Sequence, residues 1–316
     1  MAGHKIKRIL VAVKPDTEEM PLAATHARFL AESFAAEIAL LSCVSEVRLA
    51  SGLAAADPAA VEAMQTAWLE REHAVLDRLA EPLRKTGVKV TTRVSVRSPI
   101  YASILEEAEA WSADLVVVGI HEPRPVPHTR LTDVDWQLMR LCPRPLLLVA
   151  DPTIESYRTI LAAVDPLHQH AEPSGLDAAV VETAEQFAVA FQARLCVANI
   201  YPSPDDYEIV SSVEVEPGVF YGTENIKAAH LKAVEKLLGR ARSKRVDILL
   251  QSGRPATEIA ALAAQQKAEL VVLGSVKRNR LEVALMGSTA EAVVADAPCD
   301  ILLVQRAREV SEKNDE

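Results

Sequence analysis

Short apolar runs rich in β-branched residues alternate with longer amphipathic segments along the first half of the chain. The runs predict strands at Ile9–Val13, Ile38–Val44, Val88–Val94, Leu115–Val118 and Leu146–Val149. The amphipathic segments predict helices at Pro21–Phe34, about Pro58–Lys85, Ile100–Trp111 and Trp136–Leu141. Strands that alternate with helices in this way are typical of a parallel sheet covered by helices on both faces, so we expect an α/β fold.

The second half of the chain repeats the first. The segment Ala113–Gly119 closely matches Ala268–Gly274, and at the same offset Pro143–Val149 matches Pro298–Val304. The repeat predicts helices that separate further strands, which we place at Ile160–Val164, Leu195–Ile200, Ile248–Gln251, Leu270–Leu273 and Ile301–Val304. We therefore expect two tandem, doubly wound domains, each a five-stranded parallel sheet with its own core.

The predicted domains occupy residues 1–152 and 153–308, and the polar residues 309–316 are expected to form a flexible tail. The segment Asp151–Tyr157 is the expected linker. Fusion of two copies of a homodimeric protein would relate the domains by a pseudo-twofold axis and pack them through Leu146–Val149 and Ile301–Val304. Under this hypothesis the chain is an intramolecular pseudo-dimer, and pairing of two chains into a further homodimer stays open.

Composition and charge exclude several classes of protein. The 316 residues include 34 basic and 44 acidic side chains, and the net charge of -10 repels the phosphates of nucleic acids. No apolar stretch is long enough to span a membrane and the start does not resemble a secretory signal, so we expect a cytoplasmic protein. The four cysteines lie in or beside apolar runs without a CxxC pair, which favours buried thiols over a metal site.

The chain also lacks the common catalytic signatures. It contains no Gly-x-Ser-x-Gly elbow, no HExxH motif and no Walker A lysine. We therefore expect a protein that is not a dedicated enzyme.

One region carries the pattern of an anion-binding loop. In open parallel sheets, ligands bind at the carboxyl ends of strands, where a glycine admits a phosphate and a helix N-terminus supplies N–H groups. Gly274 ends the fourth strand of the second half. A small-residue helix start follows at Gly287, Ser288 and Thr289, with Ser288 as the expected N-cap and Glu291 placed for a capping box.

This succession of a strand, a glycine, a Gly-Ser turn, a helix and a last strand resembles the universal stress protein family. The duplication, together with Leu131–Trp136 ahead of Cys142-Pro143, makes the chain similar to tandem, E-type members. The resemblance implies an adenine nucleotide alpha hydrolase-like fold and ATP as ligand, with the need for Mg²⁺ left open. It implies that Asp165 faces the ribose or adenine and that Ile200 packs on the base. It also implies phosphate contacts from Gly274, Gly287, Ser288 and Thr289. Hydrolysis of the ATP would need a base near the γ-phosphate and a carboxylate for magnesium, and Asp165 is the one candidate. We therefore expect no ATPase activity or a very slow one.

The two halves depart from the family pattern to different degrees. In the second half Lys277 replaces a glycine, and its side chain either crowds the triphosphate or binds it as a cation. In the first half Lys14 replaces the aspartate, Glu122 replaces a glycine, and Thr132-Asp133 replaces the Gly-Ser pair. Because Asp133 would point a carboxylate at a phosphate, we expect no nucleotide site in the first half.

Two functions remain open at this point. In the first, the chain is a cytoplasmic stress-response protein whose second domain binds ATP or a related adenine nucleotide and signals to a protein partner through its surface. In the alternative, neither half binds nucleotide, and the chain is a scaffold or takes up an apolar small molecule. The helix Pro58–Lys85, with Met64 and Trp68 in its apolar stripe, would line such an apolar cavity.

Overall fold

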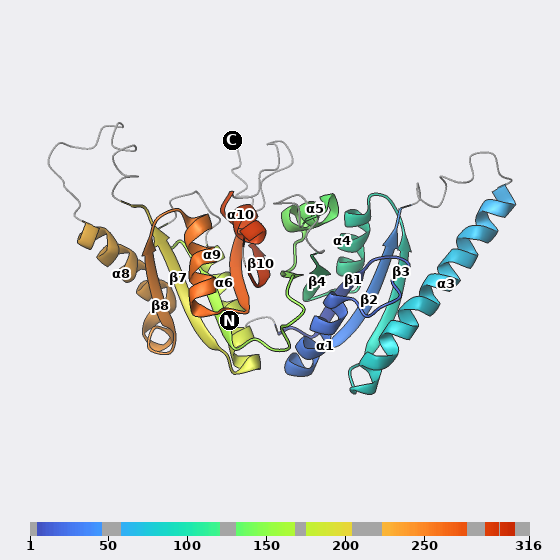
Figure 1. The fold of residues 1–316 in the computed structure, drawn as a ribbon, viewed down its shortest axis with the longest axis horizontal. Helices are drawn as coiled ribbons and strands as arrows, with labels where there is room; N and C mark the ends of the chain where they lie inside the picture. The colour runs from blue at the N-terminus through green and yellow to red at the C-terminus, as the bar shows by residue number, and fades with distance from the viewer. Residues whose placement is uncertain are drawn as a thin grey trace, which may run out of the picture. The chain divides into compact units, whose positions relative to one another are not determined.

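The computed structural model describes residues 5–45, 58–120, 131–167, 175–203, 223–276, 288–296 and 298–306. The chain divides into two compact units, Met1–Ser156 and Tyr157–Glu316. Figure 1 shows the helices and strands of both units. The expected tail at residues 309–316 lies outside the described residues.

The first unit is built on a parallel sheet. Its strands are β1 (Arg8–Val13), β2 (Glu37–Val44), β3 (Val90–Val96), β4 (Leu115–Gly119) and β5 (Leu146–Val149). They lie in the order β3-β2-β1-β4-β5, and each neighbouring pair is parallel. The helices are α1 (Leu22–Phe34), α3 (Pro58–Lys85), α4 (Ile100–Ala110) and α5 (Asp133–Leu141). Because α1 and α3 connect strands in one direction and α4 and α5 in the other, right-handed crossovers place the two pairs on opposite faces (Figure 1).

The second unit repeats this arrangement. Its strands are β6 (Thr159–Ala163), β7 (Arg194–Tyr201), β8 (Asp247–Ser252), β9 (Leu270–Val276) and β10 (Asp300–Arg306). They lie in the order β8-β7-β6-β9-β10 and are parallel. The helices are α6 (Leu176–Phe191), α8 (Thr223–Arg242), α9 (Pro255–Gln266) and α10 (Ser288–Asp296). Helix α6 contacts α8, and α9 contacts α10, so this sheet also has a pair of helices on each face.

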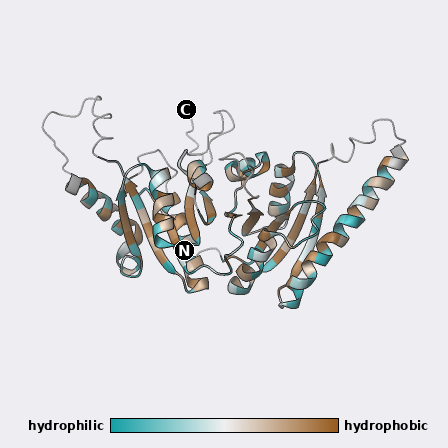
Figure 2. Ribbon diagram, in the orientation of Figure 1, coloured by the Kyte–Doolittle hydropathy of each residue, from teal (hydrophilic) through white to brown (hydrophobic). Residues whose placement is uncertain are grey.

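The predicted α/β fold is therefore confirmed. Figure 2 shows the reason, because the central strands of both units are largely hydrophobic while the helices carry both polar and apolar residues. Two elements are displaced from their predicted positions. β3 is shifted along the chain because its pairing with β2 continues as far as Val44 and Val96. α5 begins at Asp133 rather than at Trp136 because Thr132 caps the helix there.

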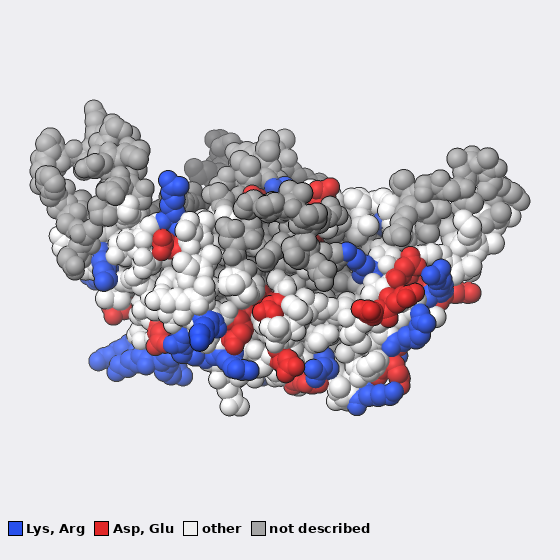
Figure 3. Space-filling view, in the orientation of Figure 1, with Lys and Arg blue, Asp and Glu red and all other residues white. Residues whose placement is uncertain are grey.

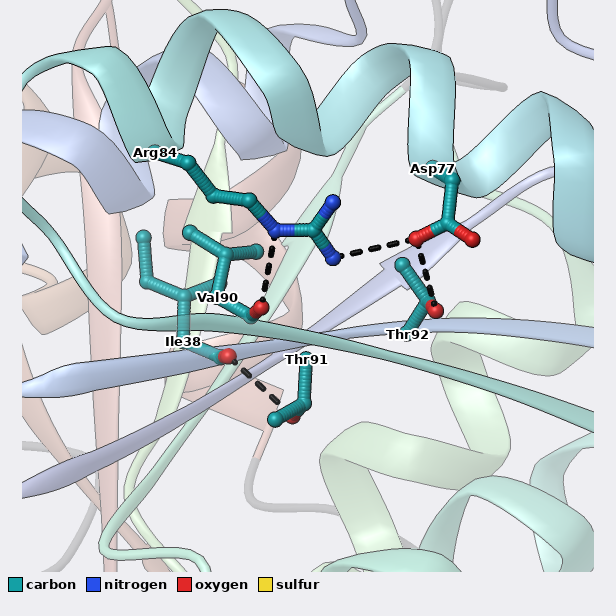
Figure 4. A network of polar contacts seen from close by, with 6 residues as sticks. All are labelled: Ile38, Asp77, Arg84, Val90, Thr91 and Thr92. Carbon is teal, nitrogen blue, oxygen red and sulfur yellow. Dashed lines mark hydrogen bonds and ion pairs between the residues drawn. The ribbon is translucent and has the colours of Figure 1, made fainter.

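The C-terminal half of α3 is fastened to β3 by polar contacts (Figure 4). The Arg84 side chain donates from Nε to the carbonyl of Val90 at 3.1 Å and from a terminal nitrogen to Oδ1 of Asp77 at 3.0 Å. The hydroxyl of Thr92 donates to the same Asp77 oxygen at 3.2 Å. These contacts fix the end of the helix on an edge strand of the sheet.

The apolar stripe of α3 is buried only in the same half of the helix. Val75, Leu76, Leu79 and Leu83 are buried, whereas Met64 is 48% exposed and Trp68 is partly exposed. The apolar stripe therefore faces the core in the C-terminal half of α3 and is more exposed toward the N-terminus. The helix is longer than the strands it covers, which accounts for this difference.

Charge is unevenly distributed over the second unit. In Figure 3, Lys and Arg gather over the C-terminal end of α8 and the turn that leads to β8. The exposed basic residues there are Lys232, Lys236, Arg240, Lys244 and Arg245. The C-terminal half of α3 alternates acidic and basic residues instead, from Glu70 to Lys85. This end of α8 is therefore basic although the chain as a whole carries a net charge of -10.

Candidate functional site

The first strand of the second unit lies where the chain reverses direction across the sheet. β6 pairs with β7 on one side and with β9 on the other, and in this register Ala163 lies beside both Ala198 and Leu273. The residues that follow these three therefore emerge at one edge of the sheet. Open α/β sheets bind ligands at the carboxyl ends of strands at such a reversal point. This edge is the candidate site.

Asp165 lies at this edge with one carboxylate oxygen unpaired. Its backbone N–H donates to Oδ1 of Asp177 at 3.0 Å. Its own Oδ1 is buried and has no hydrogen-bond partner within the described part of the chain, although the residue as a whole is partly exposed. A buried carboxylate oxygen without a donor is costly. The position therefore suits a ligand that brings a hydroxyl or an amino group.

A chain of buried hydrogen bonds lies beside Asp165. The Asn199 side chain, at the end of β7, donates from Nδ2 to the carbonyl of Val164 at 2.9 Å. Its Oδ1 lies 2.7 Å from Nδ1 of His230, which comes from α8. Both Asn199 and His230 are buried, with exposed fractions of 0% and 1%. The Tyr201 ring packs on the imidazole at a centroid distance of 5.6 Å.

The surroundings of His230 in this series of hydrogen bonds favour a neutral imidazole. Burial lowers the pKa of His230 below its ordinary value, and the nearby charge of Asp165 acts in the opposite direction. Because Asn199 uses its Nδ2 hydrogen for Val164, its Oδ1 must accept. The proton of the neutral His230 therefore sits on Nδ1, an assignment that follows from the hydrogen-bond network.

In the first unit the equivalent edge is filled by the protein's own polar groups. Lys14 follows β1 as Asp165 follows β6, and its side chain is exposed. The Ser42 hydroxyl, at the end of β2, donates to Oε1 of Glu72 at 2.7 Å. The Asp16 backbone N–H donates to Oε2 of Glu72 at 3.2 Å. Glu72 comes from α3 and is 0% exposed, so a carboxylate of the chain itself closes this edge.

The N-terminus of α5 is also occupied by a side chain of the first unit. Oδ2 of Asp135 accepts the backbone N–H of Thr132 at 2.7 Å and its hydroxyl at 2.8 Å. The Thr132 oxygen accepts the Asp135 N–H at 3.3 Å, which completes a capping box. Burial raises the pKa of Asp135, while the charge of Lys14 lowers it. The expectation that Asp133 points at a phosphate position requires correction, because Asp133 is exposed and Asp135 covers the helix end.

Comparison with known proteins assigns the chain to a family. A model of the universal stress protein family matches residues 5–150 and again residues 156–305. The chain belongs to the universal stress protein family. It is a tandem member of E type, because the family model matches twice and E-type relatives match over most of the chain.

Proteins named universal stress protein E are similar over most of the chain. The universal stress protein E homolog of Haemophilus influenzae is 27% identical over 312 residues, which cover 96% of this chain and 99% of the relative. Universal stress protein E of Escherichia coli K12 is 27% identical over 250 residues, or 78% of this chain and 75% of the relative. A solved structure assigned to a universal stress protein of Pseudomonas aeruginosa is 25% identical and has a TM-score of 0.67, with 95% of this chain and 93% of that chain covered.

The structure describes only part of the site that the sequence predicts for this universal stress protein. Asp165 follows β6, and Ile200 and Gly274 lie near the ends of β7 and β9 at the same edge. Gly274 does not end its strand as expected, because β9 continues to Val276. Lys277 and Gly287 lie outside the described residues. Helix α10 begins at Ser288, so the position before the helix, where the N-cap lies, is 287 rather than the expected 288. Thr289 lies in the first turn and is partly buried.

Three polar residues at this edge were missed from the sequence. Asp177, Asn199 and His230 are buried at 4%, 0% and 1% exposure. Asn199 carries the clearest signal, because it is a polar residue inside the apolar strand β7 and a buried amide requires partners. His230 and Asp177 give no comparable signal, since helices carry polar residues routinely.

The described residues hold neither a cluster of metal-binding side chains nor a membrane-spanning helix. Within them, no group of three or more His, Cys, Asp and Glu side chains is placed to hold a metal ion. Across the same residues, no helix is both long and apolar enough to cross a membrane. The four cysteines are buried thiols, as predicted, and burial raises the pKa of Cys43 to about 11.

Proposed function

We propose that this universal stress protein is a cytoplasmic stress-response protein that binds ATP or a related adenine nucleotide through its second unit and acts as a binding module rather than an enzyme. The nucleoside end of the site is the edge formed after β6 and β7, with Asp165 toward the ribose or adenine and Ile200 against the base. Gly274, Lys277, Gly287, Ser288 and Thr289 are assigned to the phosphates. Any hydrolysis is very slow, because Asp165 is committed to the nucleoside.

The observation that carries this proposal is the buried Oδ1 of Asp165, which has no partner among the described residues. A ribose hydroxyl or an adenine amino group would supply the missing donor. The position at the reversal of strand order supports the same reading, because ligands of open α/β sheets bind there. A ligand that lacks a donor would leave the carboxylate unsatisfied.

The first unit is proposed not to bind nucleotide. Glu72 and Asp135 place carboxylates at the two positions where a ligand would need donors, and both accept hydrogen bonds from the unit's own backbone. An anionic phosphate at α5 would meet a carboxylate that already occupies the helix end. The proposal therefore assigns one nucleotide to each chain.

The test is equilibrium binding of ATP, with and without magnesium, to nucleotide-stripped protein. Asp165→Ala is expected to weaken binding about tenfold or more, since it removes a charged acceptor from the ligand. Lys14→Ala, the change at the equivalent position of the first unit, is the matched control and is expected to leave binding unchanged. Wild-type protein that binds no adenine nucleotide would instead favour the nucleotide-free scaffold or the protein that takes up an apolar ligand.

A further inference from the structure

The turn that carries Asp165 is held by two helices from different parts of the second unit. Helix α6 holds it through Asp177, whose Oδ1 accepts the Asp165 N–H at 3.0 Å. Helix α8 holds it through His230 and Asn199, which end on the carbonyl of Val164 at 2.9 Å. Both polar groups of the peptide between Val164 and Asp165, its carbonyl and its N–H, are therefore held by hydrogen bonds.

The Asp177 carboxylate points at the loop although it lies in the first turn of a helix. Asp177 is the second residue of α6 and is only 4% exposed. An exposed acid would be enough to complement the helix dipole at this position. Burial of the carboxylate against the Asp165 N–H costs desolvation, which the charge-assisted hydrogen bond offsets. The side chain therefore connects the helix to the loop.

The His230 contact has a defined direction. Because Asn199 donates from Nδ2 to the Val164 carbonyl, its Oδ1 accepts from Nδ1 of His230. The two hydrogen bonds therefore run in one direction, from His230 through Asn199 to Val164. The Tyr201 ring lies over the imidazole at 5.6 Å and fills the neighbouring space. A buried, directed chain of this kind has few alternative arrangements, which makes it suited to hold a loop in one conformation.

The first unit lacks both supports. The second residue of α1 is Ala23, where α6 has Asp177. The loop after β1 is held instead by Glu72 of α3, through the Asp16 N–H at 3.2 Å. The equivalent of Asn199 is Ser42, which donates to Glu72 and makes no link to the β1 backbone in the described contacts. The two-helix support occurs in the unit that retains the aspartate after its first strand.

We propose that Asp177 and His230 are positioning residues that hold the Val164–Asp165 turn so that the Asp165 carboxylate stays directed at an adenine nucleoside. This inference rests on the proposed nucleotide function. Asp177 acts through the backbone N–H of Asp165, and His230 acts through Asn199. Neither side chain contacts the ligand, so their loss weakens the nucleoside end of the site without affecting the phosphate end.

The experiment compares removal of each group with its conservative replacement, by calorimetric titration with ATP and with adenosine. Asp177→Ala removes the acceptor for the Asp165 N–H, whereas Asp177→Asn retains a side-chain oxygen there. Asp177→Ala is expected to weaken both ligands by a similar factor, about tenfold, and Asp177→Asn to restore most of the affinity. The exposed Glu182→Ala, which also removes a carboxylate from α6, is the control and is expected to have no effect.

A second pair of variants covers the case in which Asp177→Ala does not fold. His230→Leu removes the donor to Asn199, whereas His230→Asn places an amide nitrogen close to the position of Nδ1. We expect weaker binding of ATP and adenosine in the first and recovery in the second. Thermal unfolding without ligand measures any purely structural damage separately from the affinity.

The outcomes separate this inference from the function on which it rests. Wild-type protein that binds neither ATP nor adenosine would overturn both. Wild-type binding that Asp177→Ala and His230→Leu leave unchanged would overturn the positioning role alone. Loss of ATP affinity without loss of adenosine affinity would also overturn it, because the effect would then arise at the phosphate end.

Discussion

Gly274 in β9 and Gly119 in β4 lie at equivalent positions of the two units, but they have different neighbours. A Cβ added at Gly274 would lie 2.8 Å from Cδ2 and 2.9 Å from Cγ of Leu176. Leu176 is fully buried at the start of α6, so it has little room to move. A Cβ added at Gly119 would meet nothing closer than 3.9 Å, the distance to Ala23. Packing therefore requires a glycine at position 274, independently of any phosphate.

We predict that Gly274→Ala destabilises the protein by about 1–3 kcal/mol through this overpacking. Gly119→Ala is the matched control and should change the free energy of unfolding by less than about 0.5 kcal/mol. Urea denaturation of the three proteins measures both values. Equal effects of the two substitutions would contradict the packing argument.

Tyr157 and Asp300 form a fully buried hydrogen bond at the first residue of the second unit. The tyrosine hydroxyl donates to Oδ2 of Asp300 at 2.9 Å, and both residues are 0% exposed. Burial, and then the charge of Asp300, raises the pKa of Tyr157 well above its ordinary value. Because the shift favours the protonated hydroxyl, Tyr157 is the donor of this hydrogen bond at neutral pH.

Tyr157→Phe removes this donor and leaves a buried carboxylate oxygen with one partner fewer. We expect a loss of about 1–3 kcal/mol in the free energy of unfolding. Tyr101→Phe in α4, which removes a partly exposed hydroxyl, should have a much smaller effect. A negligible change for Tyr157→Phe in chemical denaturation would show that the pair contributes nothing to stability.

At the scale of single elements, α8 makes stability depend on pH. Burial lowers the pKa of His230 below the ordinary histidine value of 6.5, so the unfolded chain binds more protons than the folded one just below that pH. The contribution of the neutral His230 to the free energy of unfolding is therefore fully present above pH 6.5. It is lost as the pH falls toward the pKa of the folded state. The loss cannot exceed about 1.4 kcal/mol per pH unit for one proton.

We predict that His230→Asn removes this pH dependence, because asparagine does not titrate. The measurement is the free energy of unfolding between pH 7 and pH 5 for wild-type and variant proteins. His73→Asn, at an exposed position of α3, should retain the wild-type slope. A variant at position 230 with the full wild-type slope would assign the pH dependence to other groups.

The N-terminus of α5 offers a second test on an element. Thr132→Ala removes the side-chain cap and one of the two groups that donate to Asp135, so we expect a cost of about 1 kcal/mol in stability. The same change should not alter nucleotide affinity, because the first unit is proposed to bind none. Reduced ATP binding by folded Thr132→Ala protein would place a nucleotide at α5.

At the scale of the whole molecule, periodicity and repetition were enough to predict the parallel α/β sheets. A strand as apolar as β4 buries both of its faces, which requires a layer of helices on each side of the sheet. The hydrophobic pattern alone therefore predicts its surroundings. The polar interior was not predictable in the same way. Glu72 and His230 occur in helices rich in charged residues, and nothing local distinguishes a buried polar residue from an exposed one. Their burial depends on tertiary contacts with Ser42 and Asn199.

Duplication allows the two units to keep one fold and carry different sites. The first unit closes its strand edge with Glu72 and its helix end with Asp135. The second unit keeps Asp165, with an oxygen that no described residue satisfies. We therefore propose that each chain binds one nucleotide, through the second unit.

Calorimetric titration of nucleotide-stripped protein with ATP and magnesium tests this claim most directly, run beside a Gly287→Trp variant and the Thr132→Ala variant. We predict saturable ATP binding near one site per chain, which Gly287→Trp abolishes and Thr132→Ala retains. No binding in any of the proteins, two sites per chain, or a single site that survives Gly287→Trp would contradict it.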